Sequence, residues 1–256
     1  MIKAIFFDVD GTLMSHKTSL IPKSTLNSLF KLKQKNIKVF LATGRHMLEL
    51  SQLPLYHFPF DGYALLNGQL TLDEHKQLIS SNPLCYEAVN KVIPIFNDKI
   101  IPISIVEEKR LYINFINEYV EIAQKSISSS APPIDIYKGN DIYQLTVFTN
   151  NKDDIELITH LPNCKMIQWH DQSYDVISAS GDKTSGIKSL LNHFNISQND
   201  IMAFGDGEND IEMLQYAKIG IAMGNAKQKV KSSADFITKD IDEDGIEYAL
   251  QYFNIL

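Results

Sequence analysis

Short apolar runs alternate with amphipathic segments at the start of the chain. Residues 2–7 form an apolar run typical of a strand that is buried on both faces, and a second run covers residues 37–42. Between them, Ser24 can cap a helix, and one face of that helix is apolar at Leu26, Leu29, Phe30 and Leu32. This strand–helix–strand order predicts a right-handed crossover between parallel strands.

The same alternation returns at the other end of the chain. Apolar positions mark one face of a helix that ends near Phe194, and strands are expected at residues 201–204, 218–222 and 235–238. A further helix follows the first of these strands, with Ile211, Met213 and Leu214 on its apolar face. We therefore expect the two ends of the chain to form one parallel sheet with helices on both faces.

The middle of the chain has a different pattern. Strands are expected at residues 142–148, 165–169 and 174–177, with helices near 86–96 and 153–160. The fold class that follows is α/β, with a Rossmann-like core made from residues 1–82 and 181–256. Residues 83–180 are expected to form an inserted α+β domain.

Composition narrows the class of protein. The chain has 256 residues, of which 44% are hydrophobic and 21% charged, as in ordinary globular domains. A net charge of −7 supplies no basic field for nucleic acid, and no apolar run approaches the roughly 18 residues of a membrane span. With only Cys85 and Cys164 to form a disulfide, a reducing and cytoplasmic location is expected.

Two carboxylates follow the first predicted strand, in the segment Asp8-Val9-Asp10-Gly11-Thr12. Oxygen ligands of this kind suit Mg²⁺, and the glycine allows a sharp turn. An acidic turn with no ligand is the alternative, and this motif alone does not decide between the two. In a parallel sheet, however, Asp8 would lie at the carboxyl edge, where ligand sites collect.

Two further segments carry groups that bind phosphate. Thr43-Gly44-Arg45 follows the second predicted strand, where a hydroxyl and the backbone N–H groups at the start of a helix can cradle a phosphate. An ordinary helix cap is the alternative. Lys183 opens the helix that ends near Phe194, and its charge can hold a phosphoryl group among carboxylates, although a single lysine is more often a solvated side chain.

A fourth segment, Gly205-Asp206-Gly207-Glu208-Asn209-Asp210, also follows a predicted buried strand. Asp206 and Asp210 offer oxygens to a divalent cation, and Asn209 can orient a phosphate or a neighbouring side chain. An acidic surface turn is the alternative. The joint occurrence of all four segments at strand ends or helix starts favours a single site.

These four ordered segments resemble the motifs of haloacid dehalogenase-superfamily phosphatases, in particular the Cof-like branch. The resemblance covers nearly the whole chain and includes the later segment Ala222-Met223-Gly224-Asn225-Ala226. It implies that Asp8 is a nucleophile that forms an aspartyl-phosphate and that Asp10 is the general acid and base. One difference from the family is Thr184, which stands where glycine usually follows the lysine, with the glycine delayed to Gly186.

The resemblance also implies the ligands of the site. Mg²⁺ would be held by Asp8, Asp206 and the backbone carbonyl of Asp10, and Asp210 would support the waters around the ion. Arg45 is expected to contact the substrate. The phosphoryl oxygens would be bound at the following positions: Val9, Thr43, Gly44, Lys183 and Asn209.

The large insert separates the second motif from the third. The resemblance identifies this position with an α+β cap, so residues 83–180 are expected to be a cap domain. The expected activity is Mg²⁺-dependent hydrolysis of small phosphomonoesters, either sugar phosphates or phosphorylated cofactors, by a monomer or weak homo-oligomer. Two alternatives stay open: a phosphomutase of the phosphomannomutase type, and a non-catalytic module that is phosphorylated or senses a metabolite.

Overall fold

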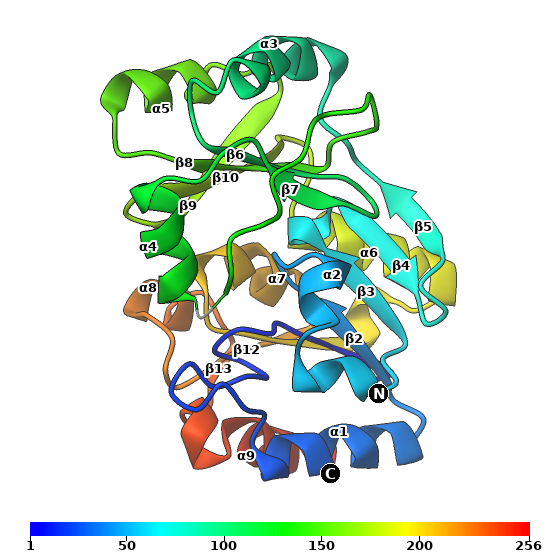
Figure 1. Ribbon diagram of the computed structural model, residues 1–256. Helices are drawn as coiled ribbons and strands as arrows, with labels where there is room; N and C mark the ends of the chain where they lie inside the picture. Colours follow the sequence, from blue (N-terminus) through cyan, green and yellow to red (C-terminus); the bar gives the residue numbers. More distant parts are fainter. Residues whose placement is uncertain (128) are drawn as a thin grey trace. The chain divides into compact units, whose positions relative to one another are not determined.

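The computed structural model describes residues 1–127 and 129–256, which divide into two compact units (Figure 1). The first unit contains Met1–Ser80 and Asp182–Leu256, and the second contains Ser81–Gly181. Across the described residues, no helix combines the length and apolar character that a membrane crossing requires. Each unit has its own sheet and its own core.

The first sheet has eight strands in the order β13-β12-β11-β1-β2-β3-β4-β5. Neighbouring strands from β13 to β3 are parallel, whereas β3 and β4 are antiparallel. The strands are β1 (Ala4–Phe7), β2 (Lys38–Ala42), β3 (Gly62–Leu65), β4 (Leu70–Asp73), β5 (Leu78–Ser81), β11 (Ile201–Gly205), β12 (Ile219–Ala222) and β13 (Phe236–Ile237). The parallel sheet expected from the two ends of the chain is confirmed.

Helices cover both faces of this sheet (Figure 1). Alternate residues of the central strands, such as Phe6 and Phe40, pack with Ile187 and Leu190 of α6 in one core cluster. On the other face, α1 packs against α9 and β2. The helices of this unit are α1 (Lys23–Gln34), α2 (Met47–Leu50), α6 (Lys183–Phe194), α7 (Ile211–Tyr216), α8 (Gln228–Lys231) and α9 (Gly245–Tyr252).

The start of α1 differs from the expectation. Its N-cap residue is Pro22, and Ser24 lies inside the first turn, where its hydroxyl donates a 2.5 Å hydrogen bond to Asp244 instead of capping the helix. Proline is tolerated at the N-cap because the backbone N–H of this residue makes no hydrogen bond within the helix, so none is lost. Phe30, expected on the apolar face, is 47% exposed and contacts the ring of Phe58 edge to face.

The second unit is an antiparallel sheet with helices on its two faces. The strand order is β7-β6-β8-β10-β9, and helices α3 and α5 pack on one face while α4 packs on the other. Val147 and the next residue, Phe148, belong to the two opposite core clusters, as the alternation of a strand requires. The elements are α3 (Tyr86–Asn97), β6 (Ile103–Val106), β7 (Leu111–Ile113), α4 (Glu118–Ser126), β8 (Gln144–Phe148), α5 (Lys152–Thr159), β9 (Cys164–His170) and β10 (Ser173–Ser178).

Candidate active site

The candidate site lies where three neighbouring parallel strands end. Phe7, the last residue of β1, pairs with Leu41 of β2 and Phe204 of β11, so the loops that follow these strands begin side by side. The backbone N–H of Asp8 donates a 3.0 Å hydrogen bond to the carbonyl of Phe204, which extends the pairing into the loop. The sheet therefore brings the first, second and fourth motifs to one edge.

Lys183 joins the first motif to the fourth. Its Nζ lies 2.6 Å from Oδ1 of Asp8 and 2.6 Å from Oδ1 of Asp210, and the lysine side chain is only 1% exposed. The lysine is the first residue of α6, whose N-cap is Asp182; the Asp182 carboxylate accepts from the backbone N–H of Ser185. The expected helix start is confirmed, and the cap fixes the point from which the lysine extends.

The delayed glycine has a packing role. A Cβ atom at Gly186 would lie 2.7 Å from the Cβ of Ala64 and 3.0 Å from the Cα of Gly68, so only glycine permits this approach of α6 to β3 and the turn after it. Thr184 is buried within the first turn of α6, and the helix still starts at Lys183. The threonine therefore does not disturb the helix start.

Three carboxylates gather beside this lysine. One oxygen from each of Asp8, Asp206 and Asp210 lies within 4.8 Å of the others. Asp8 and Asp210 are buried and Asp206 is partly buried. Carboxylate oxygens are hard ligands, so this group could hold a divalent cation such as Mg²⁺.

Asp206 is held by groups from two other segments. Its Oδ1 accepts a 3.0 Å hydrogen bond from the Thr12 hydroxyl, and its Oδ2 accepts a 3.3 Å bond from the Asn225 amide. The same amide donates to the carbonyl of Gly11 at 2.8 Å. Asn225 thus connects the loop of the first motif to the loop of the fourth. Thr12, which lies in the turn of the first motif, also binds Asp206 of the fourth.

Asp210 uses both of its oxygens within the protein. Oδ1 accepts from Lys183, and Oδ2 accepts from the backbone N–H groups of Asp206 at 3.0 Å and Gly207 at 2.9 Å. The Asp210 side chain is completely buried. These three bonds fix the loop that carries Asp206 and orient the lysine, so Asp210 is less available to a metal ion than Asp8 and Asp206.

The cluster carries more negative charge than one lysine can balance. Burial raises the pKa of Asp8 well above its ordinary value, and the charge of Asp210 raises it further, against the opposing effect of Lys183. Burial and Asp210 likewise raise the pKa of Asp206 to about 7. Burial disfavours the Lys183 ammonium, but the two carboxylates outweigh it, so the pKa of the lysine is raised. A divalent cation would relieve this excess charge.

The second motif forms a bend and not a helix start. The helix after it, α2, begins at Met47 with His46 as its cap, so the expected placement of Thr43 at a helix start is wrong. The backbone N–H of Arg45 already donates to the Thr43 hydroxyl at 3.2 Å, which closes a tighter local turn. A Cβ at Gly44 would lie 3.3 Å from the amide nitrogen of Asn67, so the glycine keeps this loop close to the turn after β3.

The side chain of Arg45 is directed at the first motif. Its Nε lies 2.6 Å from Oδ2 of Asp10 and its Nη2 lies 2.8 Å from Oδ1, which makes a two-pronged ion pair. The exposed fraction is 19% for the arginine side chain and 36% for the aspartate side chain. Val9, between the two aspartates, is buried, and its carbonyl accepts from the backbone N–H groups of Leu13 and Met14.

Asn67 belongs to the site although it lies outside the four motifs. It is buried in the left-handed conformation with φ of 54°, its N–H donates to the carbonyl of Thr43, and its Oδ1 accepts from the Asn209 amide at 3.0 Å. The signal present in the sequence is the dipeptide Asn67-Gly68, which is typical of tight turns.

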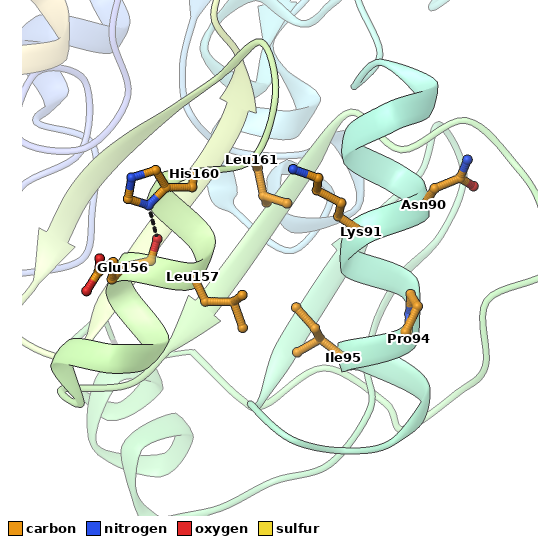
Figure 2. A pocket seen from close by; sticks show the side chains of 8 residues that line it. All are labelled: Asn90, Lys91, Pro94, Ile95, Glu156, Leu157, His160 and Leu161. Atoms are coloured by element: carbon orange, nitrogen blue, oxygen red, sulfur yellow. Dashed lines mark hydrogen bonds between the residues drawn. The ribbon is translucent and has the colours of Figure 1, made fainter.

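A separate pocket lies in the second unit between α3 and α5 (Figure 2). Its volume is about 520 Å³, and Ile95, Leu157 and Leu161 supply much of its apolar lining. Lys91 and His160 add polar groups, and a ring nitrogen of His160 lies 2.7 Å from the carbonyl of Glu156. No residue of the four motifs lines this pocket.

Comparisons with known proteins agree with this geometry. A family model described as haloacid dehalogenase-like hydrolase matches residues 5–250. The Bacillus subtilis (strain 168) protein named "Putative phosphatase YkrA" is 32% identical, over 99% of this chain and 98% of its own. A solved structure of the HAD subclass IIB sugar phosphatase BT4131 is 35% identical with a TM-score of 0.86, over 99% of this chain and 100% of that chain. A hypothetical protein from Geobacillus kaustophilus HTA426 is 32% identical with a TM-score of 0.91, and each chain is covered completely. The present chain therefore belongs to the haloacid dehalogenase-like hydrolases and is an enzyme of their phosphatase and phosphotransferase group.

Proposed function

We propose that this enzyme is an Mg²⁺-dependent phosphatase that hydrolyses small phosphomonoesters through an aspartyl-phosphate on Asp8. The observation that carries the proposal is the cluster of Asp8, Asp206 and Asp210 around the buried Lys183 ammonium. A nucleophilic carboxylate beside a cation site and a buried ammonium is the arrangement that phosphoryl transfer needs.

The donor set fits Mg²⁺. Asp8, Asp206 and the backbone carbonyl of Asp10 would hold the ion, since the oxygens of Asp210 are engaged by Lys183 and two amides. When bound, the ion supplies positive charge to the phosphoryl oxygens and to the attacking carboxylate. The raised pKa values of Asp8 and Asp206 support this proposal, because both follow from burial with uncompensated negative charge.

The protein also offers donors to the phosphoryl oxygens. Lys183 contributes its ammonium group, and Asn209 contributes an amide that is oriented by Asn67. Thr43 lies in the adjacent bend, where its hydroxyl is within reach of the same edge of the sheet. The residues proposed to seat the phosphoryl group are Val9 and Gly44 through their backbone, with Thr43, Lys183 and Asn209 through their side chains.

Hydrolysis proceeds in two displacements at phosphorus. A carboxylate oxygen of Asp8 attacks the phosphorus, the bond from phosphorus to the ester oxygen breaks, and Asp10 gives its proton to that oxygen so that an alcohol leaves. Water then attacks the phosphorus of the aspartyl-phosphate and gives a proton to Asp10. The bond to Asp8 breaks, inorganic phosphate leaves, and both carboxyl groups return to their starting forms.

The substrate class follows from family likeness. The 35% identical neighbour is named a sugar phosphatase, so sugar phosphates are proposed first and phosphorylated cofactors second. The second unit, Ser81–Gly181, is proposed to be the cap domain that provides substrate-contacting residues. Its position between the second and third motifs supports this assignment.

The test is hydrolysis of p-nitrophenyl phosphate and of a hexose 6-phosphate, with and without Mg²⁺. Wild-type protein should release inorganic phosphate only with the metal, and Asp8→Asn should lose the activity. Mass spectrometry after acid quenching should find the phosphoryl group on the peptide that contains Asp8. Full activity of Asp8→Asn would exclude this nucleophile, and an isomeric hexose phosphate in place of free phosphate would indicate a mutase.

A further inference from the structure

Arg45 holds Asp10 by both oxygens of its carboxylate. The two hydrogen bonds, of 2.6 Å and 2.8 Å, come from adjacent nitrogens of one guanidinium group. Such a two-pronged contact fixes the plane of the carboxylate, which a single bond leaves free to rotate. At 36% exposure, the Asp10 side chain would otherwise be one of the less restrained acidic groups at this edge of the sheet.

The arginine is itself anchored by its backbone. Its N–H donates to the Thr43 hydroxyl at 3.2 Å, and its carbonyl accepts from the N–H of Leu66 at 3.3 Å. Glu49, half-buried in α2, also interacts electrostatically with the guanidinium group. The loop after β2 therefore presents the guanidinium group to Asp10 from a fixed base.

The chain uses arginine at only two positions, Arg45 and Arg110, and both bind carboxylates through several N–H groups. Arg110, in the second unit, contacts both oxygens of Glu107 and one oxygen of Asp135. Lysine offers a point charge and no planar fork, so it cannot reproduce either arrangement. Arg110 therefore provides a matched arginine outside the candidate active site.

We propose that Arg45 is a positioning residue for Asp10 and not a ligand of the substrate phosphate; this inference rests on the proposed phosphatase function. Each carboxylate oxygen can accept two hydrogen bonds, and the two-pronged contact from Arg45, called the fork below, uses one of them on each oxygen. The second lone pair of either oxygen is then available to bind the proton that moves to the leaving oxygen. The fork also matches the carboxylate that remains on Asp10 after this transfer.

The role predicts a dependence on the leaving group. An alkyl alkoxide must receive a proton as it leaves, whereas the p-nitrophenolate anion is stable without one. Formation of the aspartyl-phosphate therefore needs a correctly oriented Asp10 only for the alkyl ester, while the later attack of water uses Asp10 as the base for both esters. Because kcat/KM reports the steps up to release of the alcohol, loss of the contact with Arg45 should lower kcat/KM for a hexose 6-phosphate by about tenfold or more, within the range that general acid catalysis contributes. For p-nitrophenyl phosphate, kcat/KM should change by less than about threefold.

The experiment compares Arg45→Met, Arg45→Lys, Asp10→Asn and the double variant Asp10→Asn/Arg45→Met on both esters with Mg²⁺. Both arginine variants should show the selective loss in kcat/KM for the hexose 6-phosphate, and kcat/KM of the double variant should be no lower than that of Asp10→Asn alone. Arg110→Lys should leave the ratio of the two kcat/KM values unchanged. Thermal melting identifies any variant that does not fold, and Arg45→Lys then carries the comparison if Arg45→Met fails.

Other results would overturn the inference. Equal losses in kcat/KM for the two esters would show that Arg45 binds the phosphoryl group directly and does not act through Asp10. If wild-type protein releases no phosphate from either ester, the proposed function itself fails and this inference fails with it.

Discussion

The side-chain amide of Asn209 donates a 3.0 Å hydrogen bond to Oδ1 of Asn67. The bond joins the loop after β11 to the turn after β3, two segments far apart in sequence. The Asn67 backbone N–H also bonds the carbonyl of Thr43, so one buried residue sets the relative position of two loops proposed to seat the phosphoryl group. Its left-handed backbone, with φ of 54°, is a conformation that asparagine and glycine adopt most readily.

Replacing Asn67 with glycine should weaken substrate binding without straining the backbone. The Asn67→Gly variant keeps the conformation but loses the bond to Asn209, worth about 1 kcal/mol, so KM should rise about fivefold with a smaller change in kcat. Steady-state kinetics on p-nitrophenyl phosphate measures this. Asn36→Gly is the matched control, because Asn36 also has a left-handed φ, of 57°, and is exposed after α1. An unchanged KM in Asn67→Gly would contradict the role assigned to this bond.

Removing the Lys183 charge should destabilise the metal-free protein. Lys183→Met leaves Asp8 and Asp210 facing each other in a buried site, and breaking a buried pair in this way costs about 3–5 kcal/mol. Adding Asp8→Asn should recover part of the loss, because one of the two unpaired charges is removed. Urea unfolding in EDTA measures both effects, and phosphatase activity should fall at least about a hundredfold in Lys183→Met.

A surface lysine provides the control for Lys183. Lys229 pairs with Glu208 at 2.7 Å, but both side chains are largely exposed, so Lys229→Met should change the free energy of unfolding by less than about 1 kcal/mol. If the two lysine variants lost equal stability, the special electrostatic role of the buried lysine would be refuted.

Gly11 permits the close approach of the first motif to Asp206. Its φ is +82°, and a Cβ there would lie in the space of the Asp206 carboxylate, 2.8 Å from Oδ1. Gly11→Ala should therefore displace Asp206 and weaken Mg²⁺ binding by about tenfold or more, a change within the range measured for residues that orient metal ligands. The Mg²⁺ concentration for half-maximal activity measures the effect.

A Gly139→Ala variant is the control that distinguishes the steric clash at Gly11 from the strain of a left-handed backbone. Its φ of +87° is similar, but no atom lies within 4 Å of a Cβ built there. Gly139→Ala should lower the free energy of unfolding by about 1–2 kcal/mol, the usual cost of a left-handed alanine. The Mg²⁺ requirement should stay unchanged. The same shift in Mg²⁺ requirement in both variants would show that local strain, and not contact with Asp206, is responsible.

The sequence predicts the central strands well because they are continuous apolar runs. The runs at residues 2–7, 37–42 and 201–204 correspond to β1, β2 and β11. A run of about four to six apolar residues is enough to predict a strand that is buried on both faces. The strands β3 and β4 were not predicted, since each has four residues and the turn between them holds Asn67 in a left-handed conformation. In the second unit, β6 and β7 were likewise not predicted, because strands this short show little periodic pattern. The helix α4 was not predicted either, although the sequence holds its signals: Asn117 caps the helix, and Val120 and Ala123 lie on its buried face.

Motif residues are readable from sequence, but their pairings are not. Lys183 is expected near carboxylates from its chemistry alone, and the structure identifies Asp8 and Asp210 as its partners. The pairing of Arg45 with Asp10 depends on side-chain rotamers and on how closely two loops approach, which no local pattern encodes. The helix expected at Thr43 is displaced to Met47 because the threonine hydroxyl closes a turn first.

The carboxylate cluster should make stability depend on both pH and Mg²⁺. The pKa of Asp206 is raised by burial and by Asp210 to about 7, so the folded metal-free protein keeps a proton that the unfolded chain has already released. This contribution to stability is fully present below about pH 4 and is lost as pH rises through about 7. In EDTA, the melting temperature should therefore decline across this window, and each kcal/mol lost should lower it by roughly 2–4 °C.

Mg²⁺ should have the opposite dependence, because it competes with the proton for the same oxygens. Its stabilising effect should be small near pH 5 and grow up to about pH 8, as the carboxylates become available. Asp206→Asn should flatten both trends when melting temperatures are compared in EDTA and in Mg²⁺. Asp200→Asn is the control, since Lys3 lowers the pKa of Asp200 and its contribution is lost only as pH falls below about 4. A metal-free melting temperature that rose between pH 4 and 7 would contradict this account of the cluster.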